Sequence, residues 1–298
     1  MTVPVSTLFE LTRHCNLNCV HCYIVDNRSR GEVSTDEVIG ILEQLAGLGV
    51  LFLTLSGGEV LLRADWLLIA QTAKRLGFSL NLFTNATLIT PLVAEQIASV
   101  GVRKVEVSLH GSRETTVDAI TQVRGSYRRI LEGIRLLRQH GVRVQVKANL
   151  LHANVGETRE FAEQAHRLGA TMRGVAPFLI PGLDDDPAPL QHMVPREAMQ
   201  AYFQHEYERL SDEGLRAALN HPCKSNERVC AIGAAEWVVS ADAYLYPCFN
   251  WRVRGFNLGA KIGQQSQHIG ETHISRSGAM ENQRERFDVF ALHDFDSI

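Results

Sequence analysis

The sequence predicts an α/β protein, in which six strand–helix units form a parallel sheet and a small α+β extension follows. Over about the first 180 residues, apolar runs rich in β-branched residues alternate with segments of helical period. Polar and glycine-rich clusters come directly after these runs, at the sheet edge where α/β enzymes build their sites. We expect residues 1–194 to form the core and residues 195–298 to form the extension.

Each unit has its own signals. The predicted strands lie at 5–11, 50–55, 79–83, 104–109, 143–148 and 171–177. Ser34-Thr-Asp-Glu37 is a capping box that opens the first helix, and Asn154 is the expected cap of the fifth. The later helical segments end at Gly77, Gly101, Gly141 and Gly169. Short connections of this kind imply right-handed crossovers, a pattern that doubly wound sheets and barrels share.

The chain changes texture after the sixth unit. Residues 181–194 contain three consecutive aspartates and are predicted to be a linker or lid with a solvated turn. A helix is expected at 195–213, and hairpin strands are expected near 235–239 and 243–246. The small C-terminal region is therefore predicted to be irregular, with a hairpin as its main element.

Composition excludes several function classes. The 298 residues are 45% hydrophobic and 21% charged, with a formal net charge of -3, which is ordinary for a soluble globular protein and gives no nucleic-acid footprint. No apolar run reaches membrane-spanning length, and the first residues lack the order of a signal peptide. Six cysteines are few for a disulfide scaffold of this length. We therefore expect a cytoplasmic protein that binds neither nucleic acid nor membrane.

Three cysteines in one short stretch carry most of the functional information. Cys15, Cys19 and Cys22 lie in His14-Cys-Asn-Leu-Asn-Cys-Val-His-Cys-Tyr23. A structural zinc site would need a fourth ligand in a paired short spacing, and a disulfide would leave one thiol unpaired. Cubane clusters usually take four cysteines, so three predict a 4Fe–4S cluster with one iron open to a small molecule.

A second motif follows the next strand. Ser56-Gly-Gly-Glu59 contains two glycines, which allow the backbone to approach a ligand closely. A simple tight turn is the alternative for an isolated glycine pair. The place of Gly57, Gly58 and Glu59 one unit after the cysteine loop favours a binding role.

Together these motifs resemble those of the radical S-adenosylmethionine (SAM) enzymes. The resemblance implies an incomplete, open (β/α)6 barrel related to the TIM barrel, with the cluster on Cys15, Cys19 and Cys22. It also implies that the amine and carboxylate of SAM chelate the open iron. It places His21 beside the adenine, with Tyr23 next to it, and it assigns the methionyl ammonium to Gly57, Gly58 and Glu59.

Other polar residues lie where family members contact SAM from the strand ends. The resemblance implies such contacts for Asn85, Ser108 and Asn149, and Thr84 is similarly placed, although each residue alone is equally typical of a strand-end cap. Lys147 is a candidate for the SAM carboxylate or a substrate, or for a paired structural lysine. Arg124 is a candidate for the same site. His110 is a candidate proton donor, although structural roles are commoner for strand-end histidines.

A second cysteine group lies in the extension. Cys223, Cys230 and Cys248, with Tyr246-Pro-Cys248 at the end, resemble the opening of a SPASM or twitch extension, which implies an auxiliary cluster. No cysteine follows Cys248, so the full SPASM pattern is not present. Three interpretations stay open: a cluster with an open iron or with His268 or His273 as fourth ligand, an impaired auxiliary site, or cysteines that bind zinc or nothing.

The resemblance implies reductive cleavage of SAM to a 5′-deoxyadenosyl radical, which abstracts hydrogen from a substrate. Peptide maturation is the leading prediction, with a cofactor, nucleotide, sugar or tetrapyrrole as the alternative substrate and a non-enzymatic iron–sulfur sensor or scaffold as the alternative class. The expected partners are an electron donor such as flavodoxin or ferredoxin, and a precursor peptide. Because the first predicted strand starts almost at residue 1, we expect a separate protein to present that peptide.

Overall fold

A computed structural model describes residues 4–24, 31–209, 236–250 and 256–257 of the chain. The strands are β1 Ser6–Glu10, β2 Phe52–Ser56, β3 Ser79–Thr84, β4 Lys104–Ser108, β5 Val144–Asn149, β6 Thr171–Ala176, β7 Glu236–Val239, β8 Tyr244–Tyr246 and β9 Phe256–Asn257. The α-helices are α1 Thr35–Gly47, α2 Trp66–Arg75, α3 Pro91–Val100, α4 Glu114–Thr121, α5 Ser126–Gln139, α6 Thr158–Arg167 and α7 Arg196–Arg209. Short 3-10 turns are η2 Val60–Leu62, η3 Val155–Glu157, η4 Leu183–Asp185 and η5 Ala188–His192. No helix among these residues is long and apolar enough to cross a membrane.

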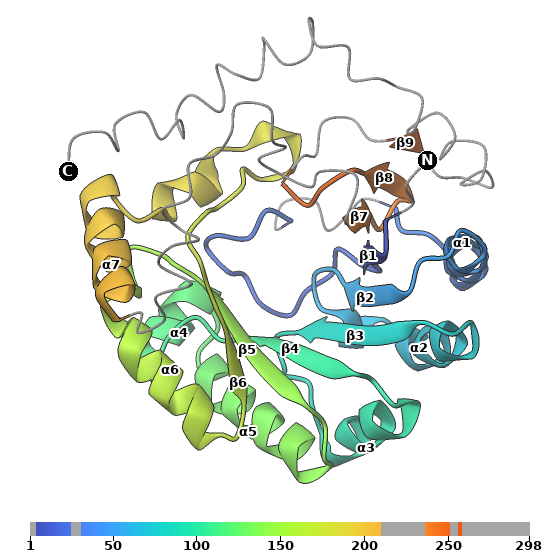
Figure 1. Ribbon diagram of the computed structural model, residues 1–298, viewed down its shortest axis with the longest axis horizontal. Coiled ribbons are helices and arrows are strands. Elements are labelled where there is room, and N and C mark those ends of the chain that lie inside the picture. The colour runs from blue at the N-terminus through green and yellow to red at the C-terminus, as the bar shows by residue number, and fades with distance from the viewer. Residues whose placement is uncertain (1–3, 25–30, 210–235, 251–255, 258–298) are drawn as a thin grey trace, which may run out of the picture.

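The strands form one open sheet in the order β6-β5-β4-β3-β2-β1-β7-β8-β9. Strands β1 to β6 are parallel and neighbours in chain order, which confirms the predicted incomplete barrel. In Figure 1 the strands fan out in an arc, and α1, α2, α3, α5 and α6 lie along its outer side. The predicted C-terminal hairpin is also present, as β7 and β8. Strand β7 pairs with β1 in parallel, so the hairpin extends the sheet of the core.

The core fills the space between the sheet and these outer helices. Along β5, Val144, Val146 and Ala148 belong to this core, while Gln145 and Lys147 alternate with them. Because successive strand residues point to opposite faces, the alternating polar residues face the inner side of the barrel. Along β5 the sheet therefore presents an apolar outer face to the helices and a polar inner face to the interior of the barrel.

The helix boundaries follow the predicted signals except at two places. The capping box at Ser34 and the left-handed glycine at Gly101 are both formed. Helix α4 was not predicted, because Arg113 gives it no side-chain cap to mark its start. The prediction that Asn154 caps the fifth helix is wrong: α6 starts after Glu157, and no side chain caps it. The Asn154 side chain is used elsewhere, as described below.

Candidate active site

The cysteine loop follows β1 and extends over the centre of the fan of strands, as the dark-blue segment in Figure 1. Cys15, Cys19 and Cys22 are half-buried thiols that form no disulfides. Two of the sulfurs accept local amide hydrogen bonds, from Leu17 N to Cys15 Sγ at 3.4 Å and from Ile24 N to Cys22 Sγ at 3.5 Å. Such donors favour the thiolate, which is the form that binds metal.

Helix α4 holds the middle of this loop. The carbonyls of Thr121 and Ile120, in its last turn, accept hydrogen bonds from Asn18 N and Val20 N, both at 2.9 Å. The last carbonyls of any helix lack partners within the helix, so the end of α4 is suited to receive a loop. Val20 also packs against a small apolar cluster of Ile120, Leu151 and Leu179. The unpredicted helix is therefore a support of the cysteine loop.

The two glycines after β2 lie against the chain that leads into this loop. Gly58 N donates to Thr12 O at 2.7 Å, and Glu59 N donates to His14 O at 2.7 Å. A Cβ at Gly57 would lie 2.4 Å from Thr12 O, and one at Gly58 would lie 2.3 Å from His14 O. Glycine is needed at both positions because backbone approaches backbone. These contacts use amide groups, whereas an ammonium ligand needs carbonyl groups.

Glu59 joins the ends of two strands. Its buried carboxylate accepts hydrogen bonds from Thr84 Oγ1 at 2.8 Å, Asn85 N at 2.7 Å and Leu61 N at 3.1 Å. Burial raises the pKa of this carboxyl, against the effect of the three hydrogen bonds. The side chain of Glu59, which was predicted to contact SAM, is thus engaged within the protein.

Asn85 links this network to the cysteine loop. Its Nδ2 donates to Asn16 Oδ1 at 2.9 Å and lies 3.8 Å from Cys15 Sγ. Its Oδ1 accepts hydrogen bonds from the backbone amide and hydroxyl of Thr87, at 2.9 and 2.7 Å. The structure therefore brings together Glu59, Asn85 and Cys15, which the sequence assigned separately.

A pair of histidines joins the cysteine loop to the segment after β4. The rings of His21 and His110 meet edge to face, with centroids 4.4 Å apart. His110 Nδ1 accepts a hydrogen bond from Asn149 N at 3.2 Å, and burial, together with His21 and Lys147, lowers the pKa of His110 well below its usual value. His110 is therefore neutral with its proton on Nε2. Burial and the nearby His192 lower the pKa of His21 to about 4.

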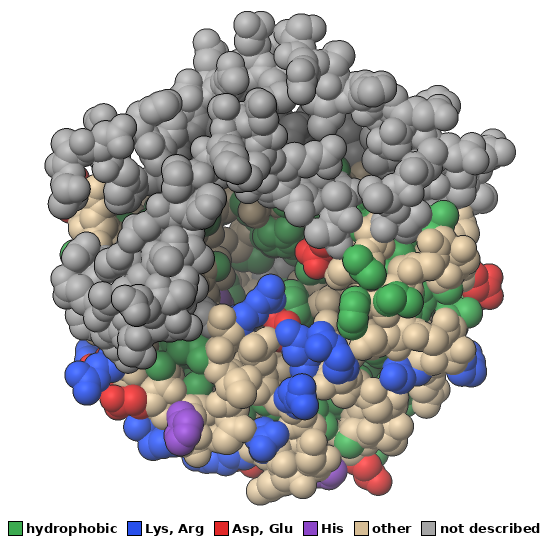
Figure 2. All heavy atoms as spheres, viewed as in Figure 1, with side chains coloured by type: hydrophobic (Ala, Val, Ile, Leu, Met, Phe, Trp, Pro, Cys, Tyr) green, Lys and Arg blue, Asp and Glu red, His purple; other side chains and the backbone are tan. Residues whose placement is uncertain are grey.

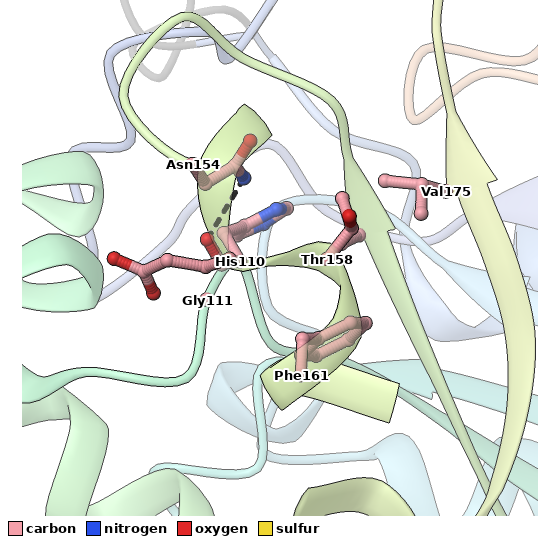
Figure 3. Close-up of a pocket in the computed structure, with 8 residues that line it drawn as sticks. His110, Gly111, Asn154, Thr158, Phe161 and Val175 are labelled. Carbon is pink, nitrogen blue, oxygen red and sulfur yellow. Dashed lines mark hydrogen bonds between the residues drawn. The ribbon is translucent and has the colours of Figure 1, made fainter. Parts of the chain in front are cut away.

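Asn154 holds the backbone of His110 by a hydrogen bond, as Figure 3 shows. Its Nδ2 donates to the carbonyl oxygens of His110 and Asn149, at 2.8 and 2.9 Å, and its Oδ1 accepts from Leu151 N at 2.8 Å. A cavity of about 10 Å³ lies here, lined by His110, Gly111, Ala148, Asn154, Glu157, Thr158, Phe161 and Val175. Its volume suits about one water molecule and excludes a cofactor. This cavity is therefore not the place of a bound cofactor.

The remaining predicted residues are placed as follows. Ser108 and Asn149 end β4 and β5, and Arg124 is exposed between α4 and α5. The Tyr23 hydroxyl donates to the Glu10 carboxylate, and its ring lies edge to face with Phe249 at 5.3 Å. The structure thus adds Glu10, at the end of an apolar strand, and that polar position was the signal that could have identified it.

Of the second cysteine group, Cys248 alone lies within the described residues. Asn250 N donates to Cys248 Sγ at 3.4 Å, in the same local pattern as at Cys15 and Cys22. Cys223, Cys230, His268 and His273 lie outside the described residues. The contact between Tyr23 and Phe249 brings the segment of Cys248 next to the cysteine loop.

The donor set fits an iron–sulfur cluster and an adjoining polar cofactor. Three thiols share one loop, and His21 Nδ1 is buried beside it with no hydrogen-bond partner. No three His, Cys, Asp or Glu side chains of the described segments converge on one ion. In a cubane cluster each cysteine binds a different iron, so the three thiols need not meet at one ion.

Comparisons with known proteins agree with this geometry. The family model described as "Radical SAM superfamily" matches residues 9–168. The "AdoMet-dependent heme synthase" of Methanosarcina barkeri is 37% identical over 180 residues, which cover 60% of this chain and 51% of the relative. The "PqqA peptide cyclase" of Rhizobium meliloti is 33% identical over 175 residues, covering 58% and 47%. The chain thus spans about half the length of these relatives.

A solved structure shows the same fold. "Streptococcus suis SuiB bound to S-adenosylmethionine" superposes with a TM-score of 0.70 at 14% sequence identity, over 91% of this chain and 67% of that one. At this identity the likeness concerns the fold, and it agrees with the open barrel.

Proposed function

The chain belongs to the radical SAM superfamily, and from this premise we propose that it holds a 4Fe–4S cluster on Cys15, Cys19 and Cys22 and cleaves SAM reductively. The observation that carries the proposal is the loop of three half-buried thiols, two with amide donors, beside the buried Nδ1 of His21. When bound, the cluster and SAM supply one-electron reduction and hydrogen-atom abstraction.

The protein supplies position and shielding. Asn85 and the α4 carbonyls of Ile120 and Thr121 hold the thiol loop in place by hydrogen bonds. Contacts fixed in advance keep reacting groups in register and remove the cost of ordering them. The neutral His110 presents Nε2–H next to His21, as a donor that stays uncharged at neutral pH.

For cofactor contacts we propose backbone groups of Gly57 and Gly58 for the methionyl ammonium and the region of His21 for the adenine. Glu59 has its carboxylate engaged with Thr84 and Asn85, so we propose that its part is to align the two strand ends. We also propose contacts with SAM for four further residues: Asn85, Ser108, Asn149 and Tyr23.

For the substrate we propose a peptide, in line with the relative named a peptide cyclase. The relative named a heme synthase supports the second candidate, a tetrapyrrole. A precursor peptide with a separate presenting protein, and an electron donor such as flavodoxin or ferredoxin, complete this proposal. We further propose an auxiliary cluster on Cys223, Cys230 and Cys248, supported by the amide donor to Cys248.

The test is anaerobic reconstitution followed by an assay for 5′-deoxyadenosine with a strong reductant. We expect product from the wild type and none from the variant in which Cys15, Cys19 and Cys22 are all alanine. Ser99→Ala, at an exposed position of α3, is the matched control and should behave as wild type. A reconstituted wild type that leaves SAM intact refutes the proposal and leaves a non-enzymatic iron–sulfur role.

Iron counting on the same triple variant tests the second cluster. Cubane iron that persists in it must be held elsewhere, and the additional change Cys248→Ala should then remove that iron. If the triple variant binds no iron at all, the auxiliary cluster is not assembled independently.

A further inference from the structure

Four charged side chains gather on the inner face of β4, β5 and β6: Lys104, Glu106, Lys147 and Arg173. Lys104 and Glu106 alternate with the core residues Val105 and Val107, which point to the outer helices. Arg173 joins them because the register of β5 and β6 shifts after the pair Val146 and Met172, leaving Arg173 as an extra residue. The result is an ionic cluster inside the barrel.

The one carboxylate of this cluster is already fully used. Glu106 Oε1 pairs with Lys104 Nζ at 2.5 Å, and Glu106 Oε2 pairs with Arg173 Nη1 at 2.5 Å. Lys104 Nζ also donates to Gln145 Oε1 at 2.9 Å. Glu106 is buried, whereas the Arg173 side chain is 54% exposed and has donors to spare.

Lys147 is the member of this cluster that has no hydrogen-bond acceptor among the described residues. Its Nζ lies 3.1 Å from the centroid of the Phe83 ring, and none of the described residues accepts a hydrogen bond from it. A ring face attracts an ammonium group but satisfies none of its three N–H donors. Burial, against the opposing effect of Glu106 and together with Arg173 and Lys104, lowers the pKa of Lys147 to about 7. Three basic side chains thus share one buried carboxylate.

The cluster lies deeper than the expected cofactor contacts. Lys147 pairs in register with Ser108 and Gly174, two residues before the end of β5, and Glu106 lies two residues before the end of β4. Lys147 is still close enough to His110 to lower its pKa. In the space-filling view of Figure 2 the molecule is hollowed near its centre, and Lys and Arg side chains gather beside that hollow.

We propose that Lys147, with Arg173, binds a carboxylate of the substrate inside the barrel. This rests on the proposed function, because it takes the space beside the cysteine loop as the place of reaction. A bound carboxylate would give the Lys147 ammonium the acceptor it lacks and would balance the excess positive charge. The substrate class is then an acid, such as an acidic or C-terminal residue of a peptide, or a propionate side chain.

Ligand-detected NMR on the anaerobically reconstituted full chain tests the proposal with probes that share one alkyl tail. The probes are hexanoate, hexyl phosphate and the neutral hexanamide. We expect hexanoate to bind the wild type, and Lys147→Met to weaken it about tenfold or more, as loss of a charge-assisted hydrogen bond does. Lys147→Arg should retain binding within about threefold, because the charge is kept. Lys74→Met, outside the barrel on α2, is the matched control.

Four results would overturn the proposal. Equal hexanoate binding by the wild type and Lys147→Met would show that Lys147 is structural. Equal binding of hexanamide would show that the alkyl tail alone is recognised. Lys147-dependent binding of hexyl phosphate without hexanoate would assign a phosphate. Displacement of hexanoate by SAM would show that Lys147 binds the cofactor and not the substrate. The 5′-deoxyadenosine assay on the wild type reports separately on the proposed function. If Lys147→Met fails to fold, loss of hexanoate binding in Lys147→Arg also counts against the proposal.

Discussion

At the scale of single residues, the site depends on polar groups that satisfy one another. Asn85 donates to Asn16 and to Cys15, and accepts two hydrogen bonds from Thr87. Its backbone amide is bound by Glu59. One side chain thus connects the loop after β3 to the cysteine loop. In its contact with Cys15 Sγ it acts as a hydrogen-bond donor that favours the thiolate form.

Replacing Asn85 by alanine should destabilise the protein by about 1–3 kcal/mol, since buried partners lose their hydrogen bonds. Urea unfolding of the wild type, Asn85→Ala and the exposed control Ser99→Ala measures this difference. Asn85→Ala should also hold less iron after reconstitution. Full stability and full iron content in this variant would mean that the network does not fix the loop.

Lys147 gives a pH dependence whose sign follows from its lowered pKa. Its pKa is about 7 in the folded chain, whereas the ordinary value of 10.5 applies in the unfolded chain, so between these two pH values the unfolded state binds more protons. The contribution of Lys147 to the free energy of unfolding should therefore increase as the pH rises from about 7 towards 10.5. The difference in unfolding free energy between Lys147→Met and the wild type, measured against pH, should shrink over this window. A constant difference contradicts the lowered pKa.

At the scale of elements, close contacts between distant segments decide which substitutions are tolerated. Gly133 lies in the middle of α5, where glycine normally weakens a helix. A Cβ at this position would lie 2.2 Å from Ala86 O, in the loop that carries Asn85. Helix α5 thus packs directly on the backbone of the site.

Gly133→Ala should destabilise the protein by about 1–3 kcal/mol, because the methyl group forces α5 away from the loop. Gly40→Ala in α1 is the matched control, since nothing lies within 4 Å of its Cβ position. There the same change should stabilise by about 0.5–1 kcal/mol. Thermal unfolding of both variants gives opposite signs if the contact is real, and equal signs if it is not.

Helix α4 supplies the side chain that caps the next helix. Asp118 on α4 accepts hydrogen bonds from Gly125 N at 2.5 Å and Tyr127 N at 3.0 Å, and so caps the start of α5 from a neighbouring helix. Burial raises the pKa of this carboxyl, but these hydrogen bonds outweigh it and hold the pKa below its ordinary value. A cap supplied from seven residues away has no local motif.

At the scale of the whole molecule, the C-terminal hairpin is part of the main sheet. Trp237, Val238 and Val239 of β7 are buried against the core, and Arg13 pairs with Asp242 at 2.6 Å next to the cysteine loop. The predicted division at residue 194 remains a prediction. The shared sheet favours joint unfolding of β7 with the barrel.

Trp237→Ala should cost about 3–5 kcal/mol, because it removes a large buried side chain beside β1. If β7 and the barrel unfold together, calorimetry should show one transition shifted to lower temperature. The exposed change Leu92→Ala on α3 serves as the control for loss of an apolar side chain. A Trp237→Ala variant that keeps the barrel transition unchanged would show that the hairpin unfolds by itself.

The sequence by itself determined what depends on local order. Strand and helix periods, glycine stops and the capping box gave the α/β units, and the spacing of Cys15, Cys19 and Cys22 gave the thiol loop. These signals are readable because propensity, capping and loop spacing act over a few residues.

Only the tertiary structure decided which distant residues meet. Four contacts join segments that lie far apart in the chain. They are the close approach of Gly57 and Gly58 to the cysteine-loop backbone, the hydrogen bonds to Glu59, the hydrogen bond from Asn154 to His110, and the pairing of β7 with β1. The same holds for Lys147, whose missing acceptor is visible only once β4, β5 and β6 are side by side. Contacts of this kind arise from packing and strand register, which no short window of sequence contains.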